Sequence, residues 1–119
     1  MQASKNVIVD LTFKFSLGIL TYTDKLEQMK KFAVANQLTK SGTSIGANVR
    51  ESQASQSNRD FVAKLKIAEK EAEETEYWLE LCQQHEVYPD PVGLREELKS
   101  IKRVLGKILS TCYRNGYHQ

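Results

Sequence analysis

The sequence has few of the residues that break helices or build cross-linked folds. Its 119 residues include two prolines, six glycines and two cysteines. So few turn-forming residues argue against many short strands, and the abundant Leu, Lys, Glu, Ala and Gln favour helices. Two cysteines make neither a disulfide framework nor a zinc site, which needs four ligands at tight spacings.

Long hydrophobic runs are also missing. The most apolar stretch, residues 7–22, is shorter than the ~20 residues of a membrane-spanning helix and contains Asp10 and Lys14. These charges are incompatible with the apolar part of a secretory signal. With 40% hydrophobic residues and a net charge of +2, the chain can build a core. We therefore expect a cytoplasmic protein that makes no membrane contact.

The charges are unevenly distributed along the chain. No linker or internal repeat divides it, so residues 1–119 are expected to form one domain. Residues 1–24 are neutral, 25–59 carry +4 (six basic, two acidic), 60–90 carry −6 (three basic, nine acidic) and 91–119 carry +4 (six basic, two acidic). The acidic segment either neutralises its neighbours or presents a separate face to a separate partner.

The spacing of apolar residues predicts four helices, at about 10–28, 32–55, 58–85 and 91–114. Steps of three and four residues recur, which is typical of helices that wrap around one another. The expected buried positions are Phe15, Ile19, Tyr22, Leu26 and Met29, then Ala35, Leu38, Gly42, Ile45, Val49 and Ser52, then Phe61, Leu65, Ala68, Ala72, Thr75, Leu79 and Cys82, and finally Leu94, Leu98, Ile101, Leu105, Ile108 and Cys112.

Signals at three helix ends support these bounds. Ser57 followed by Asp60 resembles a capping box before the third helix. Asp90-Pro91 offers a side-chain acceptor and then a residue without an amide hydrogen at the start of the fourth. Asn115-Gly116 is suited to the left-handed conformation that closes the fourth helix.

Two features of the first half admit a second interpretation. Apolar residues alternate strictly over residues 7–15, which is typical of a strand, although a lone strand among helices would have no partner. Asp24 with Glu27 resembles a capping box that would start the second helix earlier, whereas the apolar seam continues through Leu26. The boundary near Lys30-Lys31 lacks Gly and Pro and is the least defined.

Four amphipathic helices with short loops predict an all-α, up-down-up-down antiparallel four-helix bundle. Some bundles hold two metal ions with carboxylates and Glu-x-x-His pairs. The two histidines, His85 and His118, form no such pair, and the seams carry no inward Asp or Glu. A metal centre is therefore not expected.

Nucleophilic and phosphate-binding chemistry is not indicated either. Cys82 and Cys112 fall on seam positions, where cysteine usually fills space as a small apolar residue. In antiparallel helices they lie on the order of 27 Å apart and cannot form a disulfide. Gly42 and Gly46 are not followed by the Lys-Ser or Lys-Thr of a phosphate-binding loop. We expect no enzymatic activity, no cofactor and no small-molecule substrate.

Gly42 and Gly46 are expected to let two helices approach closely. Glycines four residues apart share one helical face, and each costs about 1 kcal/mol relative to alanine. Thr43 and Asn48 could hydrogen-bond across the same contact. A hinge or a ligand-facing groove is the alternative interpretation.

Stripes of opposite charge mark the third and fourth helices. They are either solvated flanks, with ion pairs of about 0–1 kcal/mol each, or surfaces that meet their opposites on another subunit. Both interpretations stay open. The acidic residues are Glu69, Glu73, Glu76 and Glu80, and the basic ones are Lys99, Arg103, Lys107 and Arg114.

Apolar residues outside the seams predict a homo-oligomer, because one bundle of this length can hardly bury them all. A second apolar face more often marks a protein interface than a small-molecule pocket. The expected interface residues are Tyr77, Trp78, Leu81, Phe13 and Leu17, with Ile67 and Leu20 as further apolar bulk on the same two helices.

Two strings carry a resemblance to a known family: SGTSIGANVRES at 41–52 and NRDFVAKLKIAEKEAEETEYWLELC at 58–82. They resemble bacterial four-helix-bundle proteins encoded in intervening sequences of large-subunit ribosomal RNA genes. The resemblance implies a ring-like homopentamer without established enzymatic activity. It also implies kinship with the accessory protein of diversity-generating retroelements, which binds a reverse transcriptase and RNA. The matching residues are Ser44, Ile45, Asn48, Val49, Arg50 and Glu51, and Gly46 stands where many relatives have Pro.

We therefore expect a non-enzymatic homo-oligomeric scaffold, pentameric by resemblance, that binds RNA or a nucleic-acid-processing protein through basic surfaces. Lysine and arginine contacts to phosphates supply most non-specific affinity. The alternative is a protein–protein adaptor that makes no contact with nucleic acid. The candidate RNA-binding residues are Lys30, Lys31, Lys40, Arg50, Arg59, Lys99, Arg103, Lys107 and Arg114.

Overall fold

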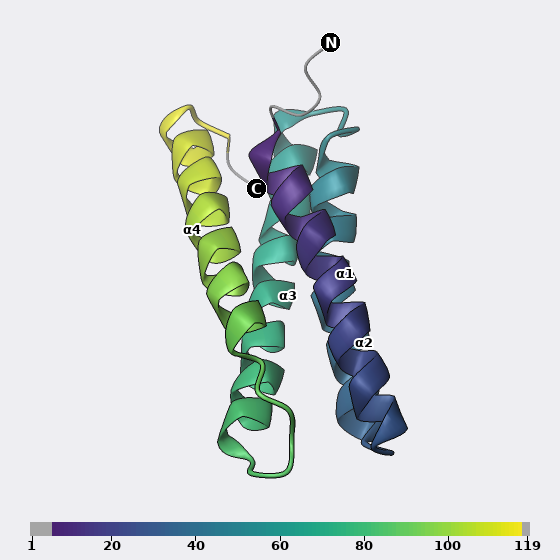
Figure 1. The fold of residues 1–119 in the computed structure, drawn as a ribbon. Coiled ribbons are helices and arrows are strands. Elements are labelled where there is room, and N and C mark those ends of the chain that lie inside the picture. Colours follow the sequence, from purple (N-terminus) through teal and green to yellow (C-terminus); the bar gives the residue numbers. More distant parts are fainter. Residues whose placement is uncertain (1–5, 118–119) are drawn as a thin grey trace.

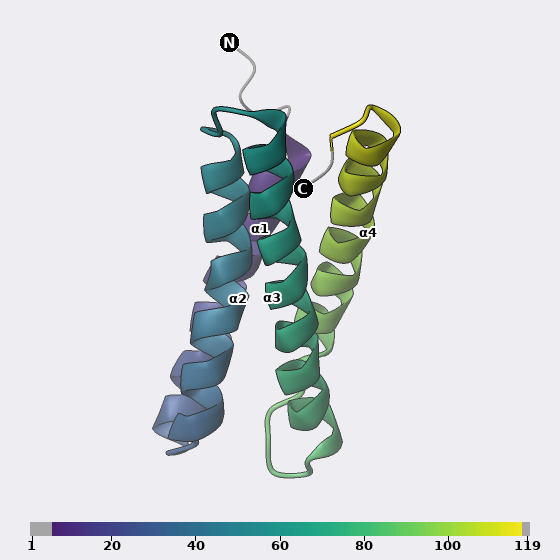
Figure 2. The same cartoon turned by 180° about the vertical axis from the view of Figure 1, so that it is seen from behind.

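Four antiparallel helices form the part of the chain that the structure, a computed structural model, describes, residues 6–117. The helices alternate in direction and follow the expected up-down-up-down order (Figures 1 and 2). No strand occurs in this range. The elements are α1 (Val7–Gln28), α2 (Phe32–Ser52), α3 (Asn58–Gln84) and α4 (Val92–Arg114).

Each helix packs mainly on the two that are adjacent around the bundle. α1 contacts α2 and α4, and α3 contacts α2 and α4, so that α1 and α3 occupy opposite corners. Both views show α4 leaning away from the other helices toward its C-terminal end (Figures 1 and 2). The outer sides of α1 and α3 therefore face in different directions.

The apolar seams form one core that runs along the bundle. Most of the expected positions are buried, including all six of α2. Met29 is an exception, because α1 ends beside it and leaves it 41% exposed. In α3 Val62 is fully buried and Phe61 only partly, and in α4 Leu109 is buried more deeply than Ile108.

The strand interpretation of residues 7–15 is wrong, because this segment is the first part of α1. Asn6 caps the helix, and its Oδ1 accepts a hydrogen bond from the Val9 amide at 3.4 Å. Ile8 and Thr12 are buried and extend the seam of Phe15 toward the N-terminus in steps of four and three. The helix consequently starts at Val7, three residues before the expected Asp10.

The boundary between α1 and α2 is made by Lys30 in the left-handed conformation, with φ of 62°. The Lys31 amide donates to the Leu26 carbonyl at 2.8 Å and the Lys30 amide to that of Glu27 at 2.9 Å, which is the bonding pattern that glycine usually closes. The alternative in which Asp24 starts the second helix is excluded, because Asp24 lies inside α1, as the seam through Leu26 indicated.

The other helix ends follow their sequence signals more closely. Ser57 Oγ accepts from the Asp60 amide at 3.0 Å. Asp90 Oδ1 accepts from the Val92 amide at 3.0 Å, although Pro91 rather than Asp90 is the N-cap, so α4 starts one residue later than expected. Gly116 has φ of 81° and closes α4 as expected. The second helix ends at Ser52 rather than at residue 55, and the chain turns before α3 begins.

Candidate functional site

Gly42 and Gly46 allow α1 and α2 to pack closely, as expected. A Cβ at Gly42 would lie 2.8 Å from Ile19 Cγ1, and one at Gly46 would lie 3.2 Å from the Thr12 carbonyl oxygen. The cross-helix bonds expected of Thr43 and Asn48 are wrong. Both side chains donate to carbonyls of their own helix, four residues earlier.

The core also contains a polar contact that the spacing in the sequence did not indicate. Thr75 Oγ1 of α3 lies 2.9 Å from Ser41 Oγ of α2, and both residues are buried. The Thr75 hydroxyl also lies 2.8 Å from the Glu71 carbonyl oxygen. Because a buried hydroxyl without a partner is costly, this pair ties α2 to α3 at one position.

A shallow groove follows the α1–α2 contact on the outside of the bundle. It has a volume of about 230 Å³ and is lined by Phe13, Ser16, Gly46 and Arg50, among others. The Arg50 guanidinium lies over the Phe13 ring, 5.3 Å from its centroid. The largest exposed apolar side chain of this part of α1 therefore has a cation beside it.

The acidic stripe of α3 is partly neutralised within the chain. Lys102 Nζ of α4 lies 2.8 Å from Glu73 Oε2 and 2.6 Å from Glu76 Oε1. Lys66 Nζ lies 2.9 Å from Glu69 Oε1. Lys102 is not among the basic residues that the spacing in the sequence singled out on α4, and it lies on the flank of α4 that faces α3.

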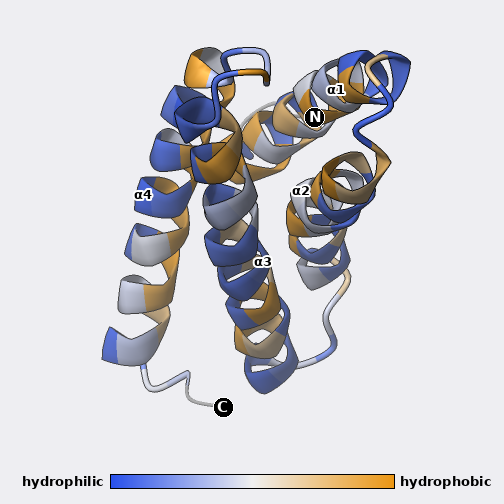
Figure 3. Cartoon of the chain, turned by 90° about the horizontal axis from the view of Figure 1, so that it is seen from below, coloured by the Kyte–Doolittle hydropathy of each residue, from blue (hydrophilic) through white to orange (hydrophobic). Residues whose placement is uncertain are grey.

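Four of the nine candidate RNA-binding residues share one face of α4. At 100° per residue this face is opposite the buried positions of the helix, and all four residues are exposed. Seen along the bundle, the apolar side of α4 is turned toward α3 and its hydrophilic side outward (Figure 3). We call these residues the basic stripe: Lys99, Arg103, Lys107 and Arg114.

The other five candidates are dispersed. Lys30 and Lys31 lie at the turn between α1 and α2, where the Lys31 ammonium is 5.4 Å from the centroid of the Tyr88 ring. Lys40 lies within α2, and Arg50 and Arg59 lie near the opposite end of the bundle. The structure therefore brings together the α4 residues but does not unite all nine.

Two outer surfaces of the bundle are apolar. The α1 face consists of Phe13, Leu17 and Leu20, which are 53%, 53% and 43% exposed. The α3 face consists of Ile67, Tyr77 and Leu81, which are 41%, 55% and 41% exposed. Its apolar residues are not contiguous, because the exposed Lys70 and Glu74 lie between Ile67 and Tyr77 on the same side of the helix.

Trp78 borders the α3 face but is less accessible than its neighbours. It is half-buried and packs against the core. Its Nε1 donates to Glu74 Oε2 at 3.3 Å, and its ring meets that of Tyr77 edge to face at 5.1 Å. The indole is therefore only partly accessible, and it supports the Tyr77 ring.

The part of the chain that the structure describes contains no group of three or more His, Cys, Asp or Glu side chains placed to hold a metal ion. Cys82 and Cys112 are free and buried, and burial raises the pKa of both thiols. A thiol of raised pKa is a poor nucleophile. His85 Nδ1 accepts from the Val87 amide at 3.4 Å, and His118 lies outside the described residues.

None of the described helices is both long enough and apolar enough to cross a lipid bilayer. The fold and its surfaces define a small all-α bundle with two apolar outer faces and a basic stripe. The chain belongs to the 23S rRNA-intervening sequence protein family, whose model matches residues 4–107.

A solved structure has the same fold. It is a protein of unknown function from the S23 ribosomal protein family of Bacteroides thetaiotaomicron, 38% identical in sequence, with a TM-score of 0.82. The similarity covers 86% of this chain and 97% of that one. Among curated proteins no match was found.

Proposed function

We propose that this protein is a non-catalytic, cytoplasmic scaffold that assembles from several copies into a ring, a pentamer by family resemblance, and binds RNA or an RNA-containing partner. The observation that carries the proposal is the pair of exposed apolar faces on α1 and α3. Exposed apolar patches of this kind usually mark interfaces, and covering them removes apolar surface from water.

The RNA-binding part of the proposal is supported by the basic stripe. Its side chains point away from the core, while Lys102 and Lys66 serve the acidic residues of α3. Repeating the stripe around a ring multiplies the number of phosphate contacts that one RNA can make. A monomer offers only four such side chains in a row.

Light scattering coupled to size exclusion tests the assembly. The expected result is one species with several times the mass of the 13.6 kDa chain. A mass equal to that of one chain at micromolar concentration would contradict the proposal, because the two apolar faces would then be tolerated in water.

Binding of a generic single-stranded RNA, titrated with salt, tests the second part. We expect the logarithm of the association constant to fall linearly with the logarithm of salt concentration. An assembly that binds no RNA at low salt would instead be a protein–protein adaptor.

A further inference from the structure

The two apolar faces lie at opposite corners of the bundle, and this arrangement restricts how copies can meet. A contact between two α1 faces covers those faces and leaves both α3 faces exposed. A contact between the α1 face of one copy and the α3 face of the next covers one face on each copy. Repetition of this contact gives a closed ring of copies if the rotation from one copy to the next is a whole fraction of a full turn. The inference below rests on the assembly proposed above and specifies which residues meet.

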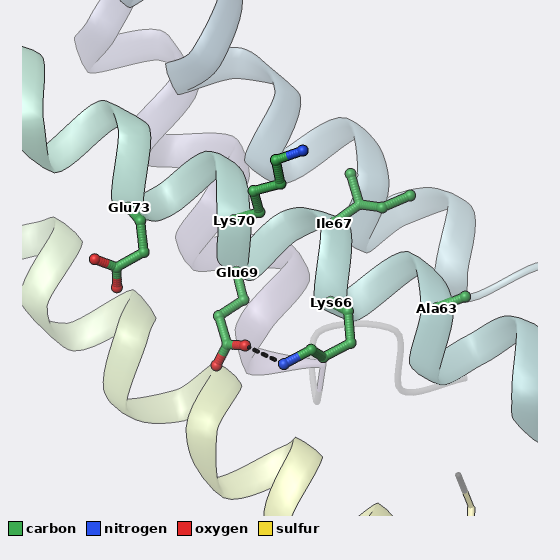
Figure 4. Close-up of a pocket in the computed structure, with 6 residues that line it drawn as sticks. All are labelled: Ala63, Lys66, Ile67, Glu69, Lys70 and Glu73. Carbon is green, nitrogen blue, oxygen red and sulfur yellow. Dashed lines mark hydrogen bonds and ion pairs between the residues drawn. The ribbon is translucent and has the colours of Figure 1, made fainter. Parts of the chain in front are cut away.

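A shallow hollow of about 490 Å³ lies on the N-terminal half of α3 and shares Ile67 with the α3 face. Figure 4 shows Ala63, Ile67 and Lys70 directed to one side of α3, while Glu69 and Glu73 are directed toward α4. Ala63 is small and leaves room beside Ile67. Ala63 and Ile67 are thus the apolar residues of the hollow, and charged side chains of both signs border it: Lys66, Glu69, Lys70 and Glu73.

The side chain best suited to this hollow is Phe13 on the α1 face. It is 53% exposed, and the Arg50 guanidinium covers part of its ring at 5.3 Å. A phenyl ring fills a hollow of this kind and gains from nearby ammonium groups. Arg50 would approach the second copy together with the ring.

Heights along the bundle match as well. α1 and α3 start at the same end (Figure 1), where Asn6 Nδ2 donates to Gln53 Oε1 at 2.6 Å. At ~1.5 Å per residue, Phe13 lies ~9 Å from the start of α1 and Ala63 lies ~8 Å from the start of α3. Copies related by rotation about an axis along the helices stay level, so Phe13 of one copy and Ala63 of its neighbour lie at the same height.

The charges agree with the same register. Arg50 lies two residues before the end of α2, and Asp60 lies two residues after the start of α3, so both are ~3 Å from the same end of the bundle. Both are exposed. A contact between unlike faces therefore brings a guanidinium opposite a carboxylate.

We propose that Phe13 of one copy packs into the α3 hollow of the next, beside Ala63 and Ile67, with Arg50 opposite Asp60. Each copy inserts its Phe13 side chain into one neighbour, and its own α3 hollow accommodates Phe13 of the other neighbour. The junction is asymmetric and uses a different surface on each side.

Mixing two variants tests this junction. Phe13→Glu removes the ring but keeps the hollow, and Ala63→Trp fills the hollow but keeps the ring. Each variant alone is expected to have the mass of one chain by light scattering. An equimolar mixture retains one intact junction per pair and is expected to form a 1:1 dimer. Val92→Glu, at an exposed position on α4, serves as the control and keeps the wild-type mass.

The outcomes separate this inference from the assembly itself. If the wild type assembles and both variants keep the mass of the wild-type assembly, Phe13 and Ala63 do not form the junction, whereas the proposed assembly is unaffected. A mixture that stays monomeric also overturns the junction. If the wild type is monomeric, both proposals fail. Charge reversal tests the ion pair separately. Arg50→Glu and Asp60→Arg should each weaken assembly at least several-fold, and the double variant should restore it. If the double variant does not restore assembly, Arg50 and Asp60 do not pair in the junction.

Discussion

Lys30 makes a turn that usually belongs to glycine. Among residues 6–117, Lys30 is the one residue other than glycine whose φ is positive, at 62°. A non-glycine residue in this conformation destabilises the folded protein by roughly 1–2 kcal/mol. Glycine would remove this strain, but it would also increase the conformational entropy of the unfolded chain, which offsets part of the gain. The absence of Gly at this turn was the reason that the sequence left the boundary undefined.

We expect Lys30→Gly to raise the free energy of unfolding by about 1 kcal/mol, since the turn is retained and its strain removed. Urea denaturation followed by circular dichroism measures the change. Lys31→Gly is the matched control, because Lys31 has an ordinary negative φ of −90° and should gain nothing. Equal effects of both variants would contradict the explanation.

Two helical glycines should respond in opposite ways to alanine. At Gly42 a Cβ would lie 2.8 Å from Ile19 Cγ1, which belongs to a fully buried side chain, so Gly42→Ala should destabilise by about 1–3 kcal/mol. At Gly106 no atom lies within 4 Å of the added Cβ, and Gly106→Ala should stabilise α4 by about 0.5–1 kcal/mol. Thermal unfolding of the two variants decides between packing and helix propensity.

The attachment of α4 to α3 depends in part on Lys102. Burial lowers the pKa of Lys102, but hydrogen bonds and the charges of Glu73 and Glu76 outweigh this effect, and the pKa lies above its usual value. A group whose pKa is raised by folding stabilises the fold in its protonated form. Its contribution is complete below the ordinary lysine pKa and is lost as the pH rises through the folded value.

Lys102→Met should therefore lower the free energy of unfolding by up to about 1 kcal/mol at neutral pH. The gap between wild type and variant should stay constant up to about pH 10 and narrow as the pH rises above the ordinary lysine pKa of about 10.4, because only the wild type loses a charged contact there. Urea midpoints at several pH values measure the gap. Lys99→Met is a suitable control, since Lys99 Nζ lies as far as 4.0 Å from Glu96 Oε2 on the same helix. A gap that does not change with pH would show that Lys102 acts only through packing.

The contact between Ser41 and Thr75 couples α2 to α3. We expect Ser41→Ala and Thr75→Val each to destabilise the protein, and the double variant to be less destabilised than the sum, with a coupling of about 1 kcal/mol. The reason is that either single change leaves one buried hydroxyl without its partner across the helices. Additive effects in a double-mutant cycle would contradict the coupling.

The basic stripe determines the expected interaction of the whole molecule with RNA. Replacing Lys99, Arg103 and Lys107 with glutamine should weaken binding and reduce the slope of the salt dependence by about 0.7 per lost phosphate contact. A matched triple change of Lys14, Lys25 and Lys64 alters the net charge equally at other places. If both triple variants weaken binding alike, net charge rather than the stripe is responsible.

Much of the fold could be predicted from the sequence because local patterns are repeated and consistent. The steps of three and four identified the four helices and most of their buried residues, and Ser57, Asp90 and Gly116 indicated three ends. The start of α1 was predicted less well. Alternating apolar residues resembled a strand there, and only the burial of Ile8 and Thr12 against other helices resolves the ambiguity.

Surfaces depend on how helices are placed around one another, and sequence spacing leaves that placement open. The sequence by itself determined the helices, the core and the presence of excess apolar and basic side chains. Only the tertiary structure decided that Lys102 reaches Glu73 and Glu76, that Arg50 covers Phe13, and that the two apolar faces lie at opposite corners. The physical reason is that periodicity acts within a helix, whereas these contacts depend on the relative rotation and height of different helices.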